Sequence, residues 1–362
     1  MKAVGMHILH VVGARPNFMK VAPVIAAFAE RNGVKQTLVH TGQHYDPNLS
    51  DIFFEQLEIP RPDVSLEVGS GSHAVQTAEV MVKFEQTILE RKPDWVLVYG
   101  DVNSTVAAAL VCAKLGVNIA HVEAGLRSYD RRMPEELNRL VTDQLSNLLL
   151  TSSPEAEPNL NKEGIPSDRI HFVGNVMIDT VFRLMHKAEM PDIAGLDGDE
   201  YALVTLHRPS NVDDPETLKR ILTALNDIST KLKLVFPIHP RTRARIDALG
   251  HELAPGVLLQ DPLGYLECVA LQKGSKLVIT DSGGLQEEST SLGIPCLTVR
   301  ENTERPITCT EGTNTLIGTD MDLLRSEFDK VMAGTGKAGK SVPKWDGKAS
   351  ERIADVILSL AK

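Results

Sequence analysis

Short apolar runs alternate with segments of helical spacing along most of the chain. The apolar runs predict buried strands, and a first series occupies residues 7–12, 36–40, 95–99, 117–121, 148–150 and 170–173. A second series occupies residues 202–206, 234–238, 257–259, 277–279 and 296–299. Residues 74–90 and 105–115 are examples of the helices expected between strands. This alternation is typical of parallel sheets with helices on both faces, so we predict an α/β protein with two doubly wound domains.

The length of 362 residues also indicates two domains, because it exceeds what one ordinary hydrophobic core supports. Residues 190–199 are acidic, contain Pro and Gly and lack periodicity, so we expect the boundary within residues 174–199. We assign residues 1–175 to an N-terminal domain and residues 176–348 to a C-terminal domain. Residues 334–348 are predicted to form a loop, and residues 349–362 contain an amphipathic helix whose packing partner is open.

Composition excludes several classes of protein. The net charge of −10, without a basic tract, argues against a nucleic-acid partner. Cys112, Cys268, Cys296 and Cys309 form no CxxC pair, which favours reduced thiols over disulfides or a zinc site. No apolar run approaches the roughly 20 residues that span a bilayer, and the N-terminus lacks a signal-peptide pattern. We therefore expect a cytoplasmic protein with no membrane partner.

The stretch at residues 280–289 organises the second half of the chain. It follows the strand at 277–279 and precedes a helical segment ending at Gly293, so it is a strand-to-helix turn. Gly283 and Gly284 allow close approach of a ligand, and Ser282 can cap a helix whose N-terminus favours an anion. Glu288 is placed to accept hydrogen bonds from a sugar diol. A nucleotide is the expected ligand; the alternative is a simple turn with glutamates that complement the helix dipole.

Polar side chains follow many of the predicted strands at their carboxyl ends. They are Arg15, Gln43, His44, Asp101 and Glu123 in the first half, and His207, His239 and Asp281 in the second. Ligands of open α/β sheets bind at this edge, so two domains that face each other would bring these loops to a central cleft.

The basic groups suit phosphate. Arg15 offers a planar fork, Lys20 lies about one helical turn further on, and Arg305 lies on a loop after the strand at 296–299. A solvated basic pair is the alternative for Arg15 and Lys20.

The acidic groups suit proton transfer. Asp101 has a second interpretation as a helix cap, Glu123 as an ion-pair partner of Arg127, and Glu135 as a first-turn glutamate beside Glu136. Together, Asp101, Glu123 and Glu135 would crowd like charges near one cleft, which raises pKa values and produces proton carriers.

Two histidines lie close to arginines after apolar strands, His207 beside Arg208 and His239 near Arg241. Histidine can donate to a diphosphate or protonate it as it leaves. A metal site is the rival interpretation, but no metal-ligand spacing such as HExxH supports it, so we expect no metal.

Eight motifs together resemble the non-hydrolysing UDP-N-acetylglucosamine 2-epimerase family. They are GARPNFMK (13–20), TGQH (41–44), GDVNST (100–105), HVEAGLRS (121–128), PEELNR (134–139), HRP (207–209), DSGGLQEE (281–288) and TERP (303–306). The resemblance implies a GT-B fold, in which two Rossmann-like domains face a central cleft that binds a UDP-sugar, and usually a homodimer. It implies catalytic roles for Asp101, Glu123, Glu135 and His207. It implies UDP contacts for Arg15, Lys20, Ser282, Gly283, Gly284, Glu288 and Arg305.

The implied reaction interconverts UDP-N-acetylglucosamine and UDP-N-acetylmannosamine for cell-surface polysaccharide precursors. The family removes the C2 proton, expels UDP to give 2-acetamidoglucal and adds UDP back, without a cofactor. Gln43, Arg208 and His239 match places where similar bacterial enzymes bind a regulatory second substrate. Relatives often have an aromatic residue at the position of Cys268. We therefore expect either a looser uracil pocket or a base that relies on the Leu263 backbone and Tyr265.

Three other functions remain open from the sequence. Relatives with the same motifs act on modified sugars such as 2,3-diacetamido uronic acids. A GT-B glycosyltransferase shares the UDP site but has no need for carboxylates around C2 of the sugar. A non-catalytic nucleotide-sugar sensor would leave the crowded carboxylates unexplained.

Overall fold

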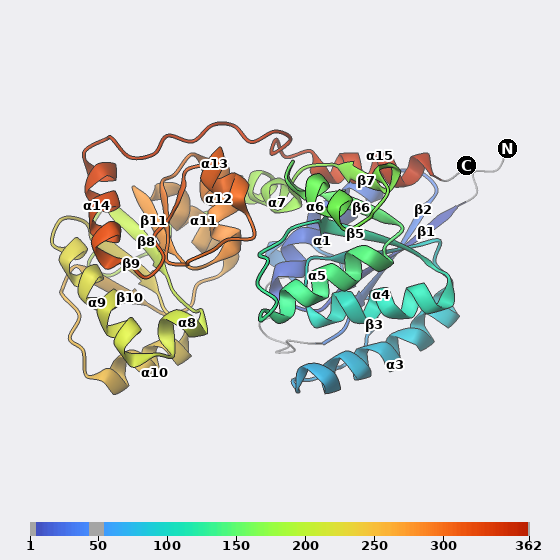
Figure 1. Ribbon diagram of the computed structural model, residues 1–362, viewed down its shortest axis with the longest axis horizontal. Coiled ribbons are helices and arrows are strands. Elements are labelled where there is room, and N and C mark those ends of the chain that lie inside the picture. Colours follow the sequence, from blue (N-terminus) through green and yellow to red (C-terminus); the bar gives the residue numbers. More distant parts are fainter. Residues whose placement is uncertain (1–4, 43–53, 361–362) are drawn as a thin grey trace. The chain divides into compact units, whose positions relative to one another are not determined.

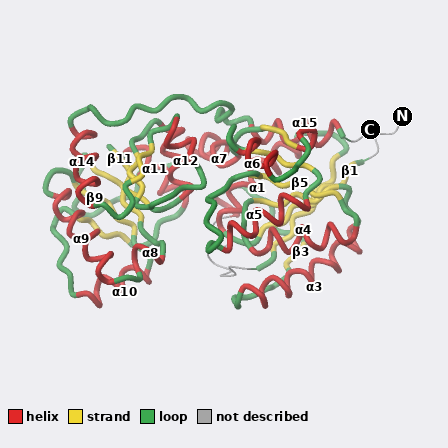
Figure 2. Tube along the Cα trace, in the orientation of Figure 1, coloured by secondary structure: helices red, strands yellow, loops and turns green. Residues whose placement is uncertain are grey.

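The computed structural model describes residues 5–42 and 54–360, and it divides into two compact units (Figure 1). Unit 1 comprises Met1–Arg183 together with Pro343–Lys362, and unit 2 comprises Leu184–Val342. The strands of each unit lie between helices, as Figure 2 shows in yellow and red. Among the described helices, none combines the length and apolar character of a membrane span.

Within the described residues, unit 1 contains a seven-stranded parallel sheet of order β3-β2-β1-β4-β5-β6-β7. Its strands are β1 (Met6–Val12), β2 (Val34–His40), β3 (Val64–Ser65), β4 (Trp95–Tyr99), β5 (Asn118–Ala124), β6 (Leu148–Thr151) and β7 (Ile170–Phe172). Its helices are α1 (Arg15–Ala29), α3 (His73–Arg91), α4 (Asn103–Leu115), α5 (Pro134–Leu145), α6 (Ala156–Lys162), α7 (Val176–Leu184) and α15 (Ala349–Ser359), with a 3-10 turn, η1, at Ser167–Arg169. Strands β1, β4 and β5 are buried along nearly their whole length, as expected of central parallel strands.

Unit 2 repeats the same arrangement in a described six-stranded parallel sheet of order β10-β9-β8-β11-β12-β13. Its strands are β8 (Tyr201–Thr205), β9 (Lys233–Pro237), β10 (Val257–Gln260), β11 (Leu277–Thr280), β12 (Cys296–Thr298) and β13 (Asn314–Leu316). Its helices are α8 (Pro209–Val212), α9 (Pro215–Ser229), α10 (Pro240–Leu249), α11 (Tyr265–Gly274), α12 (Gly283–Leu292), α13 (Pro306–Thr310) and α14 (Met321–Met332), after a 3-10 turn, η2, at Met185–Lys187. A core of Leu, Ile, Val and Phe fills the space between β8, β9, β11 and helices α9 and α14.

The predicted α/β class with two doubly wound sheets is confirmed, and each predicted strand is present with ends shifted by at most a few residues. The sequence pattern missed β3 and β13, because the sequences Val-Ser and Asn-Thr-Leu each contain a single apolar residue and so form no apolar run. The predicted loop at 334–348 lies between α14 and α15, and the predicted C-terminal helix is α15.

The C-terminal segment returns to unit 1 rather than ending in unit 2. Helix α15 packs beside α1 (Figure 1), and the indole N–H of Trp345 donates to the carbonyl of Ser152 at 2.8 Å. Our expected boundaries at 175/176 and 348/349 differ from the compact units, which place most of α7 and residues 343–348 in unit 1. Residues 343–350 contact Ser152, just after β6, and Asp179 on α7. Contacts between residues so distant in sequence cannot be recognised from the sequence pattern, which explains the difference.

A buried carboxylate on α7 anchors α15. Asp179 accepts hydrogen bonds from the backbone N–H of Ala349 at 3.1 Å and from the N–H and hydroxyl of Ser350 at 2.7 Å each. These N–H groups belong to the first turn of α15, where backbone N–H groups have no acceptor within their own helix. Asp179 thus caps α15 from another helix.

Replacement of Asp179 by Ala is expected to lower the free energy of unfolding of unit 1 by about 2–4 kcal/mol, because it leaves buried donors unpaired. Denaturant unfolding followed by circular dichroism measures the loss. Ser350→Ala, which removes only the hydroxyl bond, is the control and should cost about 1 kcal/mol. Equal losses in the two variants would contradict the capping role of the Asp179 carboxylate.

Candidate functional site

The strand order places polar loops at one position in each sheet. In unit 1, β1 pairs with β2 on one side and β4 on the other, so the chain leaves β1 and β4 in opposite directions. In unit 2, β8 lies between β9 and β11 in the same way. A crevice opens at the carboxyl ends of strands where the order reverses, and ligands of such sheets bind there. The residues after β1, β4, β8 and β11 are therefore the first candidates for binding and chemistry.

In unit 1, Lys20 and Glu123 form a buried ion pair next to the loop after β4. The Nζ of Lys20 lies 2.7 Å from Oε1 of Glu123. Gly100 has φ of +61°, and a Cβ there would lie 2.6 Å from the Nζ of Lys20. Glycine is thus required, both by the left-handed backbone and by the close approach of the ammonium group. Glu123 pairs with Lys20, whereas the carboxylates that Arg127 binds are those of Asp143 and Glu163, so the pairing differs from the expected Glu123–Arg127 ion pair.

Glu123 has a strained backbone. Its φ is +73°, in the left-handed region, and the pairing of β5 with β6 shifts register between Val122 and Ala124. Non-glycine residues in this region cost free energy and are concentrated at functional sites. A β-bulge at this point re-aims the Glu123 side chain relative to a regular strand. The strain supports a functional role for this carboxylate.

Asp143 on α5 stabilises this strained segment through hydrogen bonds. Its carboxylate accepts hydrogen bonds from Nδ1 of His121 at 2.6 Å, Nη2 of Arg127 at 2.7 Å and the N–H of Gly125 at 3.1 Å. The other ring nitrogen of His121, Nε2, lies 2.8 Å from the carbonyl oxygen of Gly100. Burial alone would raise the pKa of Asp143, but pairing with His121 and Arg127 lowers it below its ordinary value. One carboxylate therefore connects the β5 bulge with the loop after β4.

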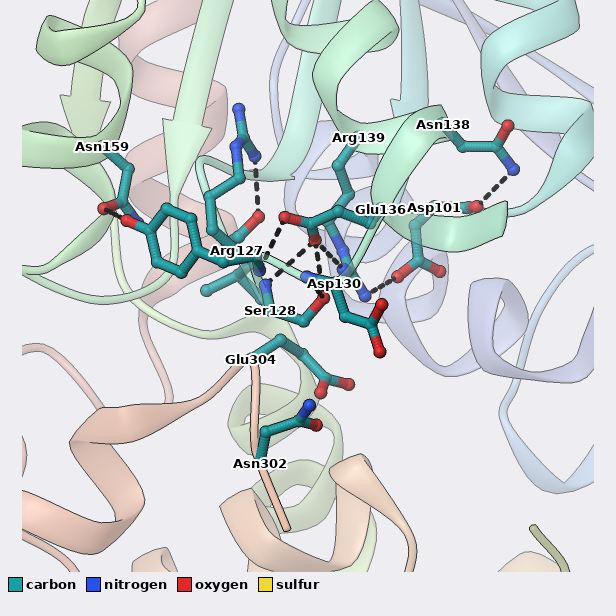
Figure 3. A network of polar contacts seen from close by, with 12 residues as sticks. Asp101, Arg127, Ser128, Asp130, Glu136, Asn138, Arg139, Asn159, Asn302 and Glu304 are labelled. Atoms are coloured by element: carbon teal, nitrogen blue, oxygen red, sulfur yellow. Dashed lines mark hydrogen bonds and ion pairs between the residues drawn. The ribbon is translucent and has the colours of Figure 1, made fainter. Parts of the chain in front are cut away.

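Arg139 on α5 links a second pair of carboxylates, shown in Figure 3. Its Nη2 donates to Asp101 at 2.5 Å and its Nη1 donates to Glu136 at 2.7 Å. Glu136 in turn accepts from the backbone N–H groups of Ser128 and Tyr129, both at 2.9 Å. Asp101 and the loop at residues 128–129 are thus fixed to the same helix.

The N-cap residue of α4 is Val102, and the carboxylate of Asp101, one residue earlier, pairs with Arg139. The side-chain amide of Asn138 donates to the Asp101 carbonyl at 2.8 Å and fixes the backbone of the loop. Glu135 is exposed at the start of α5, whereas the neighbouring Glu136 is buried. Asp101 and Glu123 each have a cationic partner, so the like-charge crowding expected from the sequence is offset by Arg139 and Lys20.

Sequence reasoning missed the polar residues that hold these loops in place. Glu136, Arg139 and Asp143 are buried and occupy one face of α5 at positions i, i+3 and i+7. A helix whose inward face is charged departs from the usual apolar stripe. The charged face of this helix is the sequence signal that could have identified these residues, because a buried charge needs an oppositely charged or hydrogen-bonding partner.

In unit 2, Asp281 orients His207. Oδ1 of Asp281 lies 2.8 Å from Nδ1 of His207, and the Asp281 carboxylate also accepts from the backbone N–H of His207 and Arg208 and from the amide of Asn211. The side chain of His207 is 56% exposed, whereas Asp281 is fully buried. Burial raises the pKa of Asp281, but the hydrogen bond from His207 and its charge bring it below the ordinary value. The arrangement leaves Nε2 of His207 as the nitrogen available to a ligand.

The first turn of α12 begins at two glycines beside buried charged groups. Ser282 is its N-cap residue, but its side chain makes no capping bond within the described helix, so the predicted cap is absent. Gly283 and Gly284 form the first helical positions, and a Cβ on Gly283 would lie 2.6 Å from Nη1 of Arg305. A guanidinium group therefore packs against the helix start, which already favours negative charge.

Glu288 lies two turns into α12 in an apolar setting. Burial, together with the neighbouring Glu287, raises the pKa of Glu288 to about 8. The Tyr265 hydroxyl donates to Oε1 of Glu288 at 3.3 Å. Leu263 is partly buried against the unit 2 core, and Sγ of Cys268 lies 4.0 Å from its carbonyl oxygen.

Arg305 belongs to a dense network of charges. Its Nη1 contacts Oε1 of Glu304 at 2.6 Å and its Nε lies 3.0 Å from Oε2 of Glu287. Nη2 of Arg300 binds the other oxygen of Glu304 at 2.8 Å. All four side chains are buried.

Four further residues expected at the site are either not fully described or exposed. Arg15 begins α1 with its side chain outside the described part, and Gln43 and His44 lie outside the described residues. His239 is exposed at the N-cap of α10, where its ring accepts from the N–H of Arg241 at 3.2 Å. Across the described ranges, no three His, Cys, Asp or Glu side chains are grouped to hold a metal ion.

Replacement of Asp143 by Asn is expected to lower the free energy of unfolding by about 3–5 kcal/mol at pH 7, because Arg127 loses a buried counter-charge. Urea unfolding measures the difference. Glu163→Gln is the control, since Glu163 binds the same arginine but its side chain is 23% exposed, so its loss should cost much less. Comparable losses would contradict the central position of Asp143.

The Asp143 variant should also change the acid dependence of stability. A carboxyl whose pKa is lowered by folding contributes stability that is present above its unfolded value and lost as pH falls through its folded value. Stability of the Asn variant should therefore vary less with pH below the ordinary pKa of 3.8 than that of the parent protein.

Comparison with known proteins shows to which family the chain belongs. Residues 26–358 match the family described as UDP-N-acetylglucosamine 2-epimerase. The UDP-N-acetylglucosamine 2-epimerase of Methanococcus maripaludis is 41% identical over 97% of this chain and 98% of its own. The UDP-2,3-diacetamido-2,3-dideoxy-D-glucuronate 2-epimerase of Pseudomonas aeruginosa is 44% identical over 98% of this chain and all of its own.

The crystal structure of Methanocaldococcus jannaschii UDP-GlcNAc 2-epimerase in complex with UDP-GlcNAc and UDP is similar with a TM-score of 0.87 and 38% identity. The matched region covers 98% of this chain and 100% of the chain in that crystal structure. The two Rossmann-like units thus have the GT-B-like fold of such structures. The chain belongs to the UDP-N-acetylglucosamine 2-epimerase family, whose members invert C2 of a UDP-sugar.

Proposed function

We propose that the protein interconverts UDP-N-acetylglucosamine and UDP-N-acetylmannosamine. The observation that carries the proposal is the placement of Asp101 just after β4 and of Glu123 near the end of the adjacent parallel strand β5, where Tyr99 pairs with Val122. Each carboxylate has a buried cationic partner, and Glu123 has a strained backbone. Two oriented carboxylates at one sheet edge are what proton transfer at a single carbon requires.

The reaction proceeds by elimination and re-addition. A base removes the proton from C2, and the electron pair forms the C1–C2 double bond while the C1–O bond to UDP breaks. The products of this step are 2-acetamidoglucal and UDP. UDP then adds back at C1 as C2 receives a proton on the opposite face. Asp101, Glu123 and Glu135 supply the acid and base groups, and no cofactor is needed for this balance of protons and electrons.

The residues of unit 2 bind the nucleotide in this proposal. The first turn of α12 with Ser282, Gly283 and Gly284 suits the diphosphate, and Arg305 adds positive charge. His207, held through Nδ1 by Asp281, donates through Nε2 to the departing phosphate. Glu288 binds the ribose hydroxyls through its carboxyl group, while Leu263 and Tyr265 contact uracil.

Arg15 and Lys20 contribute from unit 1. Arg15 begins α1, whose N-terminus follows β1 at the reversal of strand order. Lys20 is buried against Glu123, so its charge acts both on that carboxylate and on the negative charge of UDP.

A diacetamido uronic acid is the second candidate substrate. The Pseudomonas aeruginosa relative, which is named for UDP-2,3-diacetamido-2,3-dideoxy-D-glucuronate, is as similar as the relatives named for UDP-N-acetylglucosamine. Both substrates have an acetamido group at C2, so the same chemistry serves either. The two differ at C3 and C6, whereas C2, whose proton is exchanged, has the same substituent in both.

Incubation of the purified protein with UDP-N-acetylglucosamine in D2O, without an acceptor, should yield the manno epimer with deuterium at C2. Proton NMR measures both. The same assay with UDP-2,3-diacetamido-2,3-dideoxyglucuronate identifies the preferred substrate by its rate. Neither exchange nor product with either sugar would contradict the proposal, and transfer only after an acceptor is added would indicate a glycosyltransferase.

Asp101→Asn and Glu123→Gln should each slow deuterium exchange by about 100-fold or more, since general acid–base groups contribute on that scale. Calorimetric titration should show that UDP affinity is largely retained. Glu90→Gln, which removes an exposed carboxylate from α3, is the control and should exchange at the parent rate. Unchanged exchange in both site variants would rule out their assigned roles.

A further inference from the structure

The carboxylate of Glu304 is buried among arginines in unit 2. Its Oε2 lies 2.8 Å from Nη2 of Arg300, and its Oε1 lies 2.6 Å from Nη1 of Arg305. Nη2 of Arg208 approaches Oε1 to 3.9 Å. The Glu304 side chain is only 4% exposed, so these charges interact with little screening by solvent. A single carboxylate therefore lies close to three guanidinium groups.

This carboxylate also lies at the beginning of α12. A Cβ built on Gly283, the first helical residue, would lie 3.2 Å from Oε1 of Glu304 and 2.6 Å from Nη1 of Arg305. Nε of Arg208 donates to the carbonyl of Asp281, two residues before the helix, at 3.0 Å. The Glu304 oxygen thus occupies space beside the helix N-terminus where an anion is favoured. The guanidinium groups converge on the same place.

We propose that Glu304 is an internal substitute for the diphosphate of UDP, which displaces it from the arginines on binding. The inference rests on the proposed binding of UDP at the start of α12. The Glu304 carboxylate pairs the buried arginines in the free protein, and the diphosphate pairs them in the complex. Glu304 thereby sets the affinity of the site for UDP.

The energetics of buried charge support an exchange of anions. Buried guanidinium groups without a counter-charge are costly. Glu287 also lies beside Arg305, but Glu304 is the carboxylate that Arg300 and Arg305 share. The positive charges also act on one another, since burial and then the neighbouring Arg300 lower the pKa of Arg208. A diphosphate beside Glu304 would bring like charges within a few ångström of each other, so the diphosphate and the Glu304 carboxylate cannot bind the arginines at the same time. Part of the binding free energy of UDP is then used to release Glu304.

A permanent role for Glu304 in orienting Arg305 is the competing explanation. In that case the carboxylate stays in place when UDP binds, and its removal weakens binding. Displacement predicts the opposite change, because an uncharged side chain at position 304 competes less with the diphosphate. The sign of the change in UDP affinity therefore separates the two explanations.

The test is calorimetric titration of UDP into the parent protein and Glu304→Gln. We expect the variant to bind UDP about tenfold more tightly, since unit charges a few ångström apart interact on this scale at an intermediate dielectric constant. The melting temperature without UDP should fall, and the increase on adding UDP should be larger than in the parent. Glu327→Gln, which removes a carboxylate paired with Lys330 on α14, is the control and should leave UDP affinity unchanged.

Glu304→Asp provides a second variant if the Gln protein does not fold. Its shorter side chain keeps the charge but cannot reach both arginines as closely, so UDP affinity should again rise. Unchanged or weaker UDP binding in either folded variant, with binding retained by the parent, would overturn this inference alone. A folded parent protein that does not bind UDP would overturn the proposed function as well.

Discussion

The reversal of strand order beside β1 and β8 is the constraint on which both sets of functional residues depend. Parallel pairing brings all carboxyl ends to one edge of each sheet, and the reversal opens a crevice at β1 and β4 in unit 1 and at β8 and β11 in unit 2. Asp101 follows β4, whereas His207 and Asp281 follow β8 and β11. These candidate residues therefore lie on short loops next to buried strands, which leave their side chains little conformational freedom.

Buried ion pairs then fix the direction of each functional side chain. Asp101 is held by Arg139 and Glu123 by Lys20, while Asp143 ties the β5 bulge to the loop after β4. Such pairs contribute little net stability, because desolvation offsets their attraction, but loss of one partner is costly. Their value here is geometric, since they stabilise the left-handed backbone of Glu123. Unit 2 uses Asp281 in the same way for His207.

The sequence predicted the two parallel sheets because long apolar runs such as β4 and β8 are distinct from the helices between them. The short β3 and β13 lacked that signal. Asp101, Glu123 and His207 could be recognised by their position after strands, together with the family resemblance. Their partners could not, because Arg139 and Asp143 are brought to these loops by the packing of α5. The return of residues 343–360 to unit 1 depends on equally distant contacts with Ser152 and Asp179.

The central claim is that C2 is inverted through departure and return of UDP. The most direct measurement uses a UDP-sugar substrate with oxygen-18 in the bridge between C1 and the β-phosphorus, followed by phosphorus NMR. If the C1–O bond breaks, the β-phosphate oxygens become equivalent before UDP adds back, so the label should move into non-bridging positions during turnover. Epimerisation with the label fully retained in the bridge would contradict the account.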